Sequence, residues 1–435
     1  MFLHLKIRTL ILMVSLVVTC ATSLRAAPQD DSQTDSQTAA LEFIEYLNEE
    51  RFEEAAAKFD SKMKAAAPPK TLGTIWQSLK AQLGPFKKSL ESRERKQAGM
   101  TIVDVNCRFK NTTNALRIVF NVDKQISGFT VQPAFEATAD ASGEPIVLKT
   151  KTGDIHGTLE IPDGEGPYPI MLMIAGSGPT DRNGNQPTMQ NDGLKKLSEA
   201  LRENKIATLR YDKRGIAASR KAGPAEDKMS FDNFVQDASD WITLLNKDKR
   251  FSSVSVLGHS QGALVAAMAS RRATVRSVIS VAGAAAPLQD VFKKQLGPKL
   301  PATLKVQAFE IIDQLADGEK VSDVPAELKS LFRPSVQPFL ISWMKYRPVN
   351  EYKSLTVPVL VINGTTDIQI GPDSARQLAE SNTRAKLVII EDMNHVLRTC
   401  KTDAEQMKTY LDSKLPLHQD LIKSILSFQT KSDVN

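Results

Sequence analysis

The chain has 435 residues, of which 41% are hydrophobic and 24% charged, and its formal net charge is +6. This length exceeds that of a comfortable single core, so we expect two domains or one domain with large insertions. Basic and acidic residues are interleaved along the predicted helices and do not gather on one stripe. We therefore expect a globular protein with no nucleic-acid partner.

Residues 1–26 have the pattern of a cleaved export signal. Basic residues precede an apolar stretch from Thr9 to Thr19, and small residues follow as far as Ala27. The stretch is too short for a membrane span. Removing the signal takes away Lys6, Arg8 and Arg25 and leaves a net charge of about +3. We predict an exported protein, periplasmic or secreted, without an integral membrane span. A lipoprotein anchor at Cys20 is the alternative.

A small domain is predicted between this signal and the rest of the chain. Residues 27–38 are polar and lack apolar periodicity, which predicts a flexible leader. Over residues 39–135 the apolar residues first recur at helical spacing and then at every second position, as in strands. This change predicts an α+β domain. We interpret it as a docking or shielding module, because it holds no convincing catalytic group. Cys107 in this domain and Cys400 beyond it could pair or remain two unlinked thiols.

Strands and helices alternate over residues 140–435. The predicted strands are continuous apolar runs, typical of a mainly parallel sheet buried on both faces, so we expect a doubly wound α/β fold. These runs cover residues 170–175, 206–210, 254–257, 278–281, 357–362 and 387–390. Residues 288–350 contain helical patterns and prolines but no buried strand. We predict that they form a helical cap over the site, in which Phe332, Phe339, Trp343 and Met344 cover the pocket; packing between the helices alone is the alternative.

The segment Gly258–Gly262 reads GHSQG and lies between an apolar run and a small-residue helix. An ordinary glycine turn could have this sequence, but the flanking strand and helix are the context of a nucleophile elbow. Such an elbow exposes the serine hydroxyl on a sharp turn, so we predict Ser260 as the nucleophile. The backbone N–H of Gln261, directly after it, is then a predicted oxyanion donor.

A base is needed to take the serine proton, and the chain has five histidines. His4 lies in the signal, His156 on an early hairpin and His259 in the elbow itself. His395 follows the last buried strand by a short loop, at the edge where sites of open α/β sheets gather. His418 lies in the polar entry to a terminal helix, so we predict His395 as the base.

The remaining candidates follow two other strands. Asp367 comes after the strand 357–362 and a glycine turn, where it can orient the base, and Asp373 is a reserve candidate that we expect to cap a helix. A second oxyanion donor is expected from the loop after the strand 170–175. There we nominate the backbone N–H of Ser177, with Gly178 as the alternative.

Residues 144–430 resemble the α/β-hydrolase superfamily. The resemblance rests on the elbow at Ser260, the segment 176–185 reading GSGPTDRNGN, the turn 212–219, and the loops of Asp367 and His395. The order serine, acid, histidine is that of this superfamily. The segment 176–185 is similar to that of a bacterial esterase subfamily that is also related to acyl-transferase and dipeptidyl-peptidase-like hydrolases. The turn departs from the superfamily pattern at Ala217, which replaces a glycine.

The N-terminal residues resemble a small domain of uncharacterised role ahead of some bacterial hydrolases. We therefore expect an exported serine hydrolase that cleaves small carboxylic esters through an acyl-enzyme on Ser260. A serine peptidase or amidase of the same fold, or a non-enzymatic binding protein on this scaffold, is the alternative. No cofactor or metal site is expected, and the oligomeric state is left open.

Overall fold

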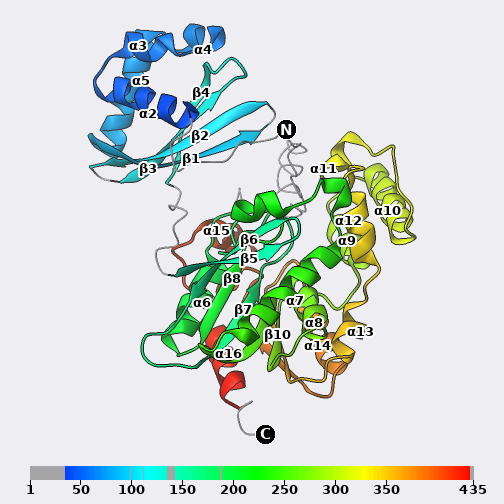
Figure 1. Cartoon of the computed structure of the whole chain (residues 1–435). Coiled ribbons are helices and arrows are strands. Elements are labelled where there is room, and N and C mark those ends of the chain that lie inside the picture. Colours follow the sequence, from blue (N-terminus) through cyan, green and yellow to red (C-terminus); the bar gives the residue numbers. More distant parts are fainter. Residues whose placement is uncertain (1–34, 98, 111, 135–142, 187–188, 432–435) are drawn as a thin grey trace. The chain divides into compact units, whose positions relative to one another are not determined.

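The computed structural model describes residues 35–97, 99–110, 112–134, 143–186 and 189–431. The predicted export signal, Cys20 and most of the predicted leader lie outside the described residues. The chain divides between residues 141 and 142 into two compact units, a smaller N-terminal one and a larger C-terminal one (Figure 1).

The smaller unit packs helices against one antiparallel sheet whose strand order is β1-β2-β3-β4. Its helices are α2 (Asp35–Asn48), α3 (Phe52–Ala57), α4 (Ser61–Ala66) and α5 (Pro69–Leu83), and its strands are β1 (Phe86–Gln97), β2 (Met100–Phe109), β3 (Thr113–Phe120) and β4 (Ile126–Pro133). Aromatic side chains such as Phe43, Trp76 and Phe109 fill the core between the helices and the sheet. Cys107 is a buried, free thiol in β2.

Two features of this unit differ from the sequence prediction. Helix α2 begins at Asp35, so the last four residues of the predicted leader, 27–38, are helical. The polar residues of the first helical turn have no apolar period, which is why sequence reasoning missed them. Strand β1 was also not predicted, because its sequence is strongly charged; it pairs along its length with β2 at the edge of the sheet.

The larger unit is built on an eight-stranded sheet of order β12-β11-β10-β9-β7-β8-β6-β5. Strands β5 and β6 form an antiparallel hairpin, β6 pairs antiparallel with β8, and the other neighbours are parallel. The predicted doubly wound, mainly parallel fold is confirmed. The strands are β5 (Glu144–Thr150), β6 (Gly153–Glu160), β7 (Tyr168–Ile174), β8 (Ala207–Tyr211), β9 (Phe251–His259), β10 (Ser277–Val281), β11 (Val359–Gly364) and β12 (Ala385–Ile390).

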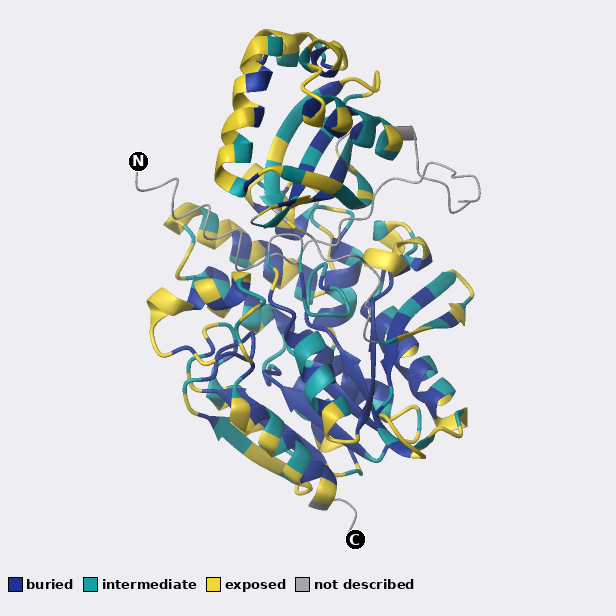
Figure 2. Ribbon diagram, turned by 90° about the vertical axis from the view of Figure 1, so that its left-hand side faces the viewer, coloured by how far each residue is buried: buried dark blue, intermediate teal, exposed yellow. Residues whose placement is uncertain are grey.

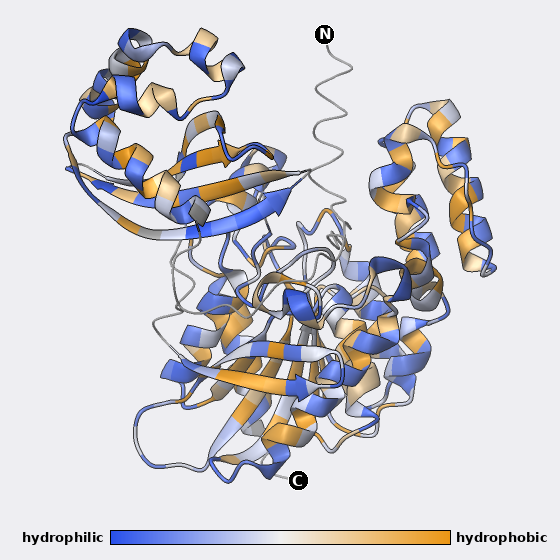
Figure 3. Cartoon of the chain, turned by 45° about the horizontal axis from the view of Figure 1, so that its top comes forward, coloured by the Kyte–Doolittle hydropathy of each residue, from blue (hydrophilic) through white to orange (hydrophobic). Residues whose placement is uncertain are grey.

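Helices cover both faces of this sheet. The central strands are buried and carry its hydrophobic residues (Figures 2 and 3). The helices that follow or precede these strands are α6 (Gly193–Glu203), η1 (Ala217–Ala222), η2 (Glu226–Lys228), α7 (Phe231–Lys247), α8 (Gln261–Ser270), α14 (Pro372–Glu380), α15 (Asp403–Leu411) and α16 (Gln419–Lys431). Because parallel neighbours end at the same edge, the loops after β7, β9, β11 and β12 lie together there.

The structure describes every residue between β10 and β11, and this interval contains helices but no strand. These helices are α9 (Leu288–Leu296), α10 (Ala302–Ala316), η3 (Ala326–Leu328), α11 (Lys329–Phe332), α12 (Gln337–Met344) and α13 (Pro348–Lys353). They occupy the interval 288–350 in which the sequence predicts a cap, and the last of them extends to Lys353.

Within the described ranges, no helix is long and apolar enough to cross a membrane. The same part of the chain contains no group of three or more His, Cys, Asp or Glu side chains arranged to hold a metal ion. Cys400, in the larger unit, is buried and free like Cys107.

Candidate active site

Ser260 lies on the corner between strand β9 and helix α8. Its backbone has φ 53° and ψ −119°, a combination that L-residues rarely adopt and that costs on the order of 1–3 kcal/mol. Its N–H donates to the Val281 carbonyl over 2.9 Å, which ties the corner to the end of β10. The fold therefore holds this serine in a strained conformation at the carboxyl edge of the sheet.

The two glycines that flank Ser260 are required by close backbone packing. A Cβ atom at Gly258 would lie 2.1 Å from the Gly262 carbonyl oxygen. A Cβ atom at Gly262 would lie 2.3 Å from the Ile174 carbonyl oxygen, at the end of β7. No side chain fits at these distances, so the spacing of the two glycines follows from the packing of the elbow on its own helix and on β7.

His395 and Asp367 meet in the loops that follow β12 and β11. His395 Nδ1 donates to Asp367 Oδ2 over 2.8 Å, and both residues are buried. The other carboxylate oxygen accepts the backbone N–H groups of Gln369 (2.8 Å) and Ile370 (2.9 Å). Since an ionised carboxylate only accepts hydrogen bonds, this arrangement places the imidazole proton on Nδ1 and leaves Nε2 able to take a proton. His395 and Ser260 line the same cavity.

His259, for which the sequence suggested no role, connects the elbow to the loop of His395. Its Nε2 lies 2.8 Å from the His395 carbonyl oxygen, and the two rings are 4.9 Å apart between centroids. Burial lowers the pKa of His259 to about 4, so the ring is neutral near pH 7 and donates its Nε2–H to that carbonyl. His259 thus holds the backbone of the candidate base, an arrangement that only the packed structure reveals.

The other predicted candidates lie elsewhere. His418 precedes α16, where its ring accepts the Asp420 N–H over 3.3 Å, and His156 lies in β6. Asp373 is exposed in the first turn of α14. It does not cap that helix as predicted, because Pro372 starts the helix and places Gly371 at the N-cap position. Of these three residues, none lines the cavity that contains Ser260.

Gln261 and Ser177, whose backbone N–H groups are the candidate oxyanion donors, both line the cavity of Ser260. Gln261 is the first residue of α8, where backbone N–H groups have no partner within the helix. Ser177 and Gly176 line the cavity with Ser260, whereas Gly178 is not among its described lining residues. A Cβ atom at Gly176 would lie 3.3 Å from the Ser260 Cβ atom, so this loop runs directly against the elbow.

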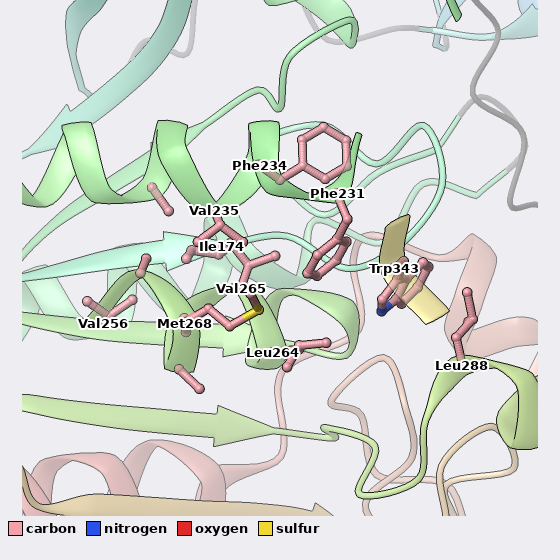
Figure 4. Packing of buried hydrophobic residues seen from close by; sticks show 14 of the residues in the cluster. Ile174, Phe231, Phe234, Val235, Val256, Leu264, Val265, Met268, Leu288 and Trp343 are labelled. Carbon is pink, nitrogen blue, oxygen red and sulfur yellow. The ribbon is translucent and has the colours of Figure 1, made fainter. Parts of the chain in front are cut away.

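The cavity has a volume of about 140 Å³. Part of its wall is apolar, and Figure 4 shows three of these side chains, Leu264 of α8, Leu288 of α9 and Trp343 of α12. The rest of the wall carries uncharged polar groups, contributed by Ser177, Thr180, Gln186, Asn191, Gln295, Tyr346, Gln369 and Tyr410. Among the described lining residues there is no Asp, Glu, Lys or Arg.

Trp343 lines the cavity as predicted, and two further aromatic residues of the predicted cap, Phe292 and Tyr346, line it as well. Sequence reasoning placed Phe332, Phe339 and Met344 over the same pocket, and none of them is among its lining residues. Phe339 packs edge-on against Phe234 of α7, with ring centroids 5.5 Å apart. A helix presents its apolar residues on more than one face, and here the other faces join the core.

The two units match two different protein families. Residues 40–129 match a family described as "Protein of unknown function (DUF3887)", and residues 191–399 match one described as "Serine aminopeptidase, S33". The esterase EstD of Thermotoga maritima is 27% identical over 366 residues, which are 82% of this chain and 87% of EstD.

Solved structures similar to the chain include other hydrolases. Est1E of Butyrivibrio proteoclasticus, solved with ferulic acid bound, is 16% identical, with a TM-score of 0.48 over 67% of this chain and 100% of that structure. Proline iminopeptidase of Mycobacterium smegmatis is 15% identical, with a TM-score of 0.44 over 67% of this chain and 99% of that structure.

The sheet order, the elbow, the family match over residues 191–399 and the relationship to EstD agree with one another. The fold and the sequence comparisons both indicate a hydrolase. The small N-terminal unit matches a different family model. The chain is therefore a member of the α/β-hydrolase superfamily, a hydrolase related to an esterase, with a small domain of unknown function ahead of its hydrolase unit.

Proposed function

We propose that the protein is an exported serine esterase that cleaves small carboxylic esters through an acyl-enzyme on Ser260. The observation that carries this proposal is the 2.8 Å hydrogen bond from His395 to Asp367, in a loop that lines the same cavity as the strained Ser260. The chain is also similar to EstD, an esterase. Strain stored at a serine beside a correctly oriented imidazole favours catalysis over simple binding.

In the proposed reaction, His395 Nε2 takes the Ser260 hydroxyl proton while Oγ attacks the ester carbonyl carbon. The tetrahedral intermediate collapses, the bond to the alcohol oxygen breaks, and His395 gives its proton to the leaving alkoxide. A water molecule then attacks the acyl-enzyme by the same route, which releases the acid and restores Ser260. Asp367 orients the imidazole and stabilises it when charged.

The oxyanion that forms in both steps needs hydrogen-bond donors. The backbone N–H of Gln261 and that of Ser177 are the proposed pair, with Gly178 as the alternative to Ser177. Gln261 follows the nucleophile directly, and the Ser177 loop packs against the elbow.

The composition of the cavity favours an ester over the free amino terminus of a peptide. An aminopeptidase must bind a charged ammonium group, and a buried charge needs a partner of opposite sign. No carboxylate is present among the described residues that line the cavity. Its apolar wall and neutral polar groups suit a small uncharged ester.

A panel of substrates tests this proposal. Purified protein should hydrolyse p-nitrophenyl esters of short and medium chain length faster than aminoacyl and dipeptidyl p-nitroanilides, because an alkoxide leaves without the protonation that an amine requires. Release of nitrophenol and nitroaniline measures the two activities directly. Good turnover of anilides with negligible ester cleavage would move the protein to the peptidase class, and binding without turnover would make it a binding protein.

The proposed export rests on the basic start, short apolar core and small residues of the first 26 positions. Protein recovered from the envelope or medium of its native cell should begin near Ala27, as read by mass spectrometry of its N-terminal peptide. An intact Met1 would contradict cleavage. An acyl-modified Cys20 at the N-terminus would instead show a lipoprotein.

A further inference from the structure

The turn 212–219, to which the proposed mechanism gives no role, is joined by hydrogen bonds to the loop 176–185 of the larger unit. Asp212 Oδ1 accepts the backbone N–H of Arg182 over 2.8 Å, and Asp212 Oδ2 accepts its guanidinium over 2.7 Å. The Asp212 carboxylate is buried, and these bonds are charge-assisted. The turn that follows β8 is therefore fixed against the loop that carries the candidate oxyanion donor.

The next residue, Lys213, contacts that loop itself. Its ammonium nitrogen donates to the Gly176 carbonyl and, over 3.1 Å, to the Gly178 carbonyl. The Phe234 ring lies on another side, 5.6 Å from Nζ. Lys213 is 2% exposed, and none of the ion pairs among the described residues includes it. Both of its hydrogen-bond acceptors are backbone atoms of one loop.

Burying an ammonium group without a carboxylate is costly, because carbonyl dipoles replace its hydration only in part. Burial lowers the pKa of Lys213 to about 7. An amine has two N–H groups and an ammonium has three, so either protonation state can donate to both carbonyls. A methionine would avoid this cost but would leave both carbonyl oxygens without their donor, so what the lysine adds at this position is its pair of hydrogen bonds to the loop.

The bond to Gly176 determines where the next N–H points. In a trans peptide the C=O and the following N–H point in opposite directions. Holding the Gly176 carbonyl toward the buried Lys213 therefore turns the Ser177 N–H to the other side. Gly176 and Ser177 line the cavity, and Gly176 lies against Ser260.

The following peptide, Ser177–Gly178, is held by two side chains of the cavity wall. The Ser177 carbonyl accepts from Thr180 Oγ1 over 2.6 Å and from Gln186 Nε2 over 3.3 Å. Both side chains line the cavity, so the Gly178 N–H points away from them. Of the two predicted donors, the geometry favours Ser177.

We propose that Lys213 is a positioning residue for the oxyanion hole, which fixes the Gly176–Ser177 peptide so that the Ser177 N–H faces the oxyanion formed at Ser260. This inference rests on the proposed esterase function. Without the lysine, the peptide is free to rotate and to turn a carbonyl oxygen toward the developing negative charge. Lys213 would then act on the transition state and little on the binding of the neutral ester.

The test is Lys213→Met, with Lys213→Arg as the variant that keeps the donors. Loss of one oxyanion donor lowers kcat by about 100- to 1000-fold, and a donor that is present but badly oriented should cost roughly 10- to 100-fold. We expect Lys213→Met to lower kcat roughly 10- to 100-fold with little change in KM. Lys213→Arg should keep part of the kcat that Lys213→Met loses. A trifluoromethyl ketone, which forms a tetrahedral oxyanion with a serine, should lose affinity by a similar factor.

A matched control removes another buried cation of the same turn. Arg214 pairs with Asp237 of α7 and makes no hydrogen bond to the loop 176–185 among the described residues. The double variant Arg214→Met/Asp237→Leu removes that ion pair without leaving a lone charge, and it should keep kcat and the affinity for the ketone. Circular dichroism and thermal unfolding of all variants separate folding from catalysis.

The role of Lys213 is wrong if Lys213→Met is folded and keeps kcat and ketone affinity, or if the control loses as much as Lys213→Met does. Should Lys213→Met not fold, Lys213→Leu, which also lacks the donors, is judged by the same criteria. Ester turnover that depends on Ser260 but not on Lys213 overturns this inference alone. A wild-type protein that cleaves none of the esters overturns the proposed function and this role together.

Discussion

Replacing Ser260 by alanine should reduce ester hydrolysis by about a thousandfold or more while the fold persists. The substitution removes the one oxygen that forms the proposed acyl-enzyme, and alanine adopts the positive φ of this corner no better and no worse than serine. Initial rates with the best nitrophenyl ester measure the loss. Ser270→Ala, the same change at the far end of helix α8, is the control and should leave the rates unchanged.

Chemical labelling gives an independent measure of the same assignment. A fluorophosphonate should modify Ser260 alone, because only a serine beside an oriented base is nucleophilic near neutral pH. Tryptic digestion and mass spectrometry locate the adduct. An adduct on a different serine, or turnover in Ser260→Ala close to that of the wild type, would remove Ser260 from the reaction.

Replacing His395 by alanine should cost a similar factor, about a thousandfold or more in kcat/KM, because the serine then has no base. Asp367→Asn should lose less, since the imidazole remains in place to take the proton. The matched control is His418→Ala, which removes an imidazole outside the cavity and should keep full activity.

Steady-state kinetics on the same ester decide between the two histidines, with thermal unfolding as the check on folding. Full activity in His395→Ala together with loss in His418→Ala would reverse the assignment of the base. Equal small losses in both would mean that neither imidazole takes the proton.

The candidate residues could be found in the sequence because their signals are local. Gly258 and Gly262 mark the elbow, since its backbone packing excludes a side chain at each position. Asp367 and His395 each follow an apolar run that forms a buried strand, and parallel strands bring such loops to one edge. The same apolar runs predicted the doubly wound sheet, because strands buried on both faces need hydrophobic residues throughout.

The small unit shows where local signals fail. Strand β1 reads as a charged segment, and only its pairing with β2 makes it a strand, because an edge strand can carry charge on an exposed face. The start of α2 was missed for a related reason, since exposed helical residues need no apolar period.

The sequence by itself determined the fold class, the elbow and the order of the candidate nucleophile, acid and base, because each depends on residues within one strand and its adjoining turn. Only the tertiary structure decided that Trp343 lines the cavity while Phe339 joins the core, and that His259 holds the loop of His395. It also decided that Lys213 holds the Gly176 carbonyl. These contacts join residues far apart in the chain, and their partners are set by how the elements pack, which no local pattern records.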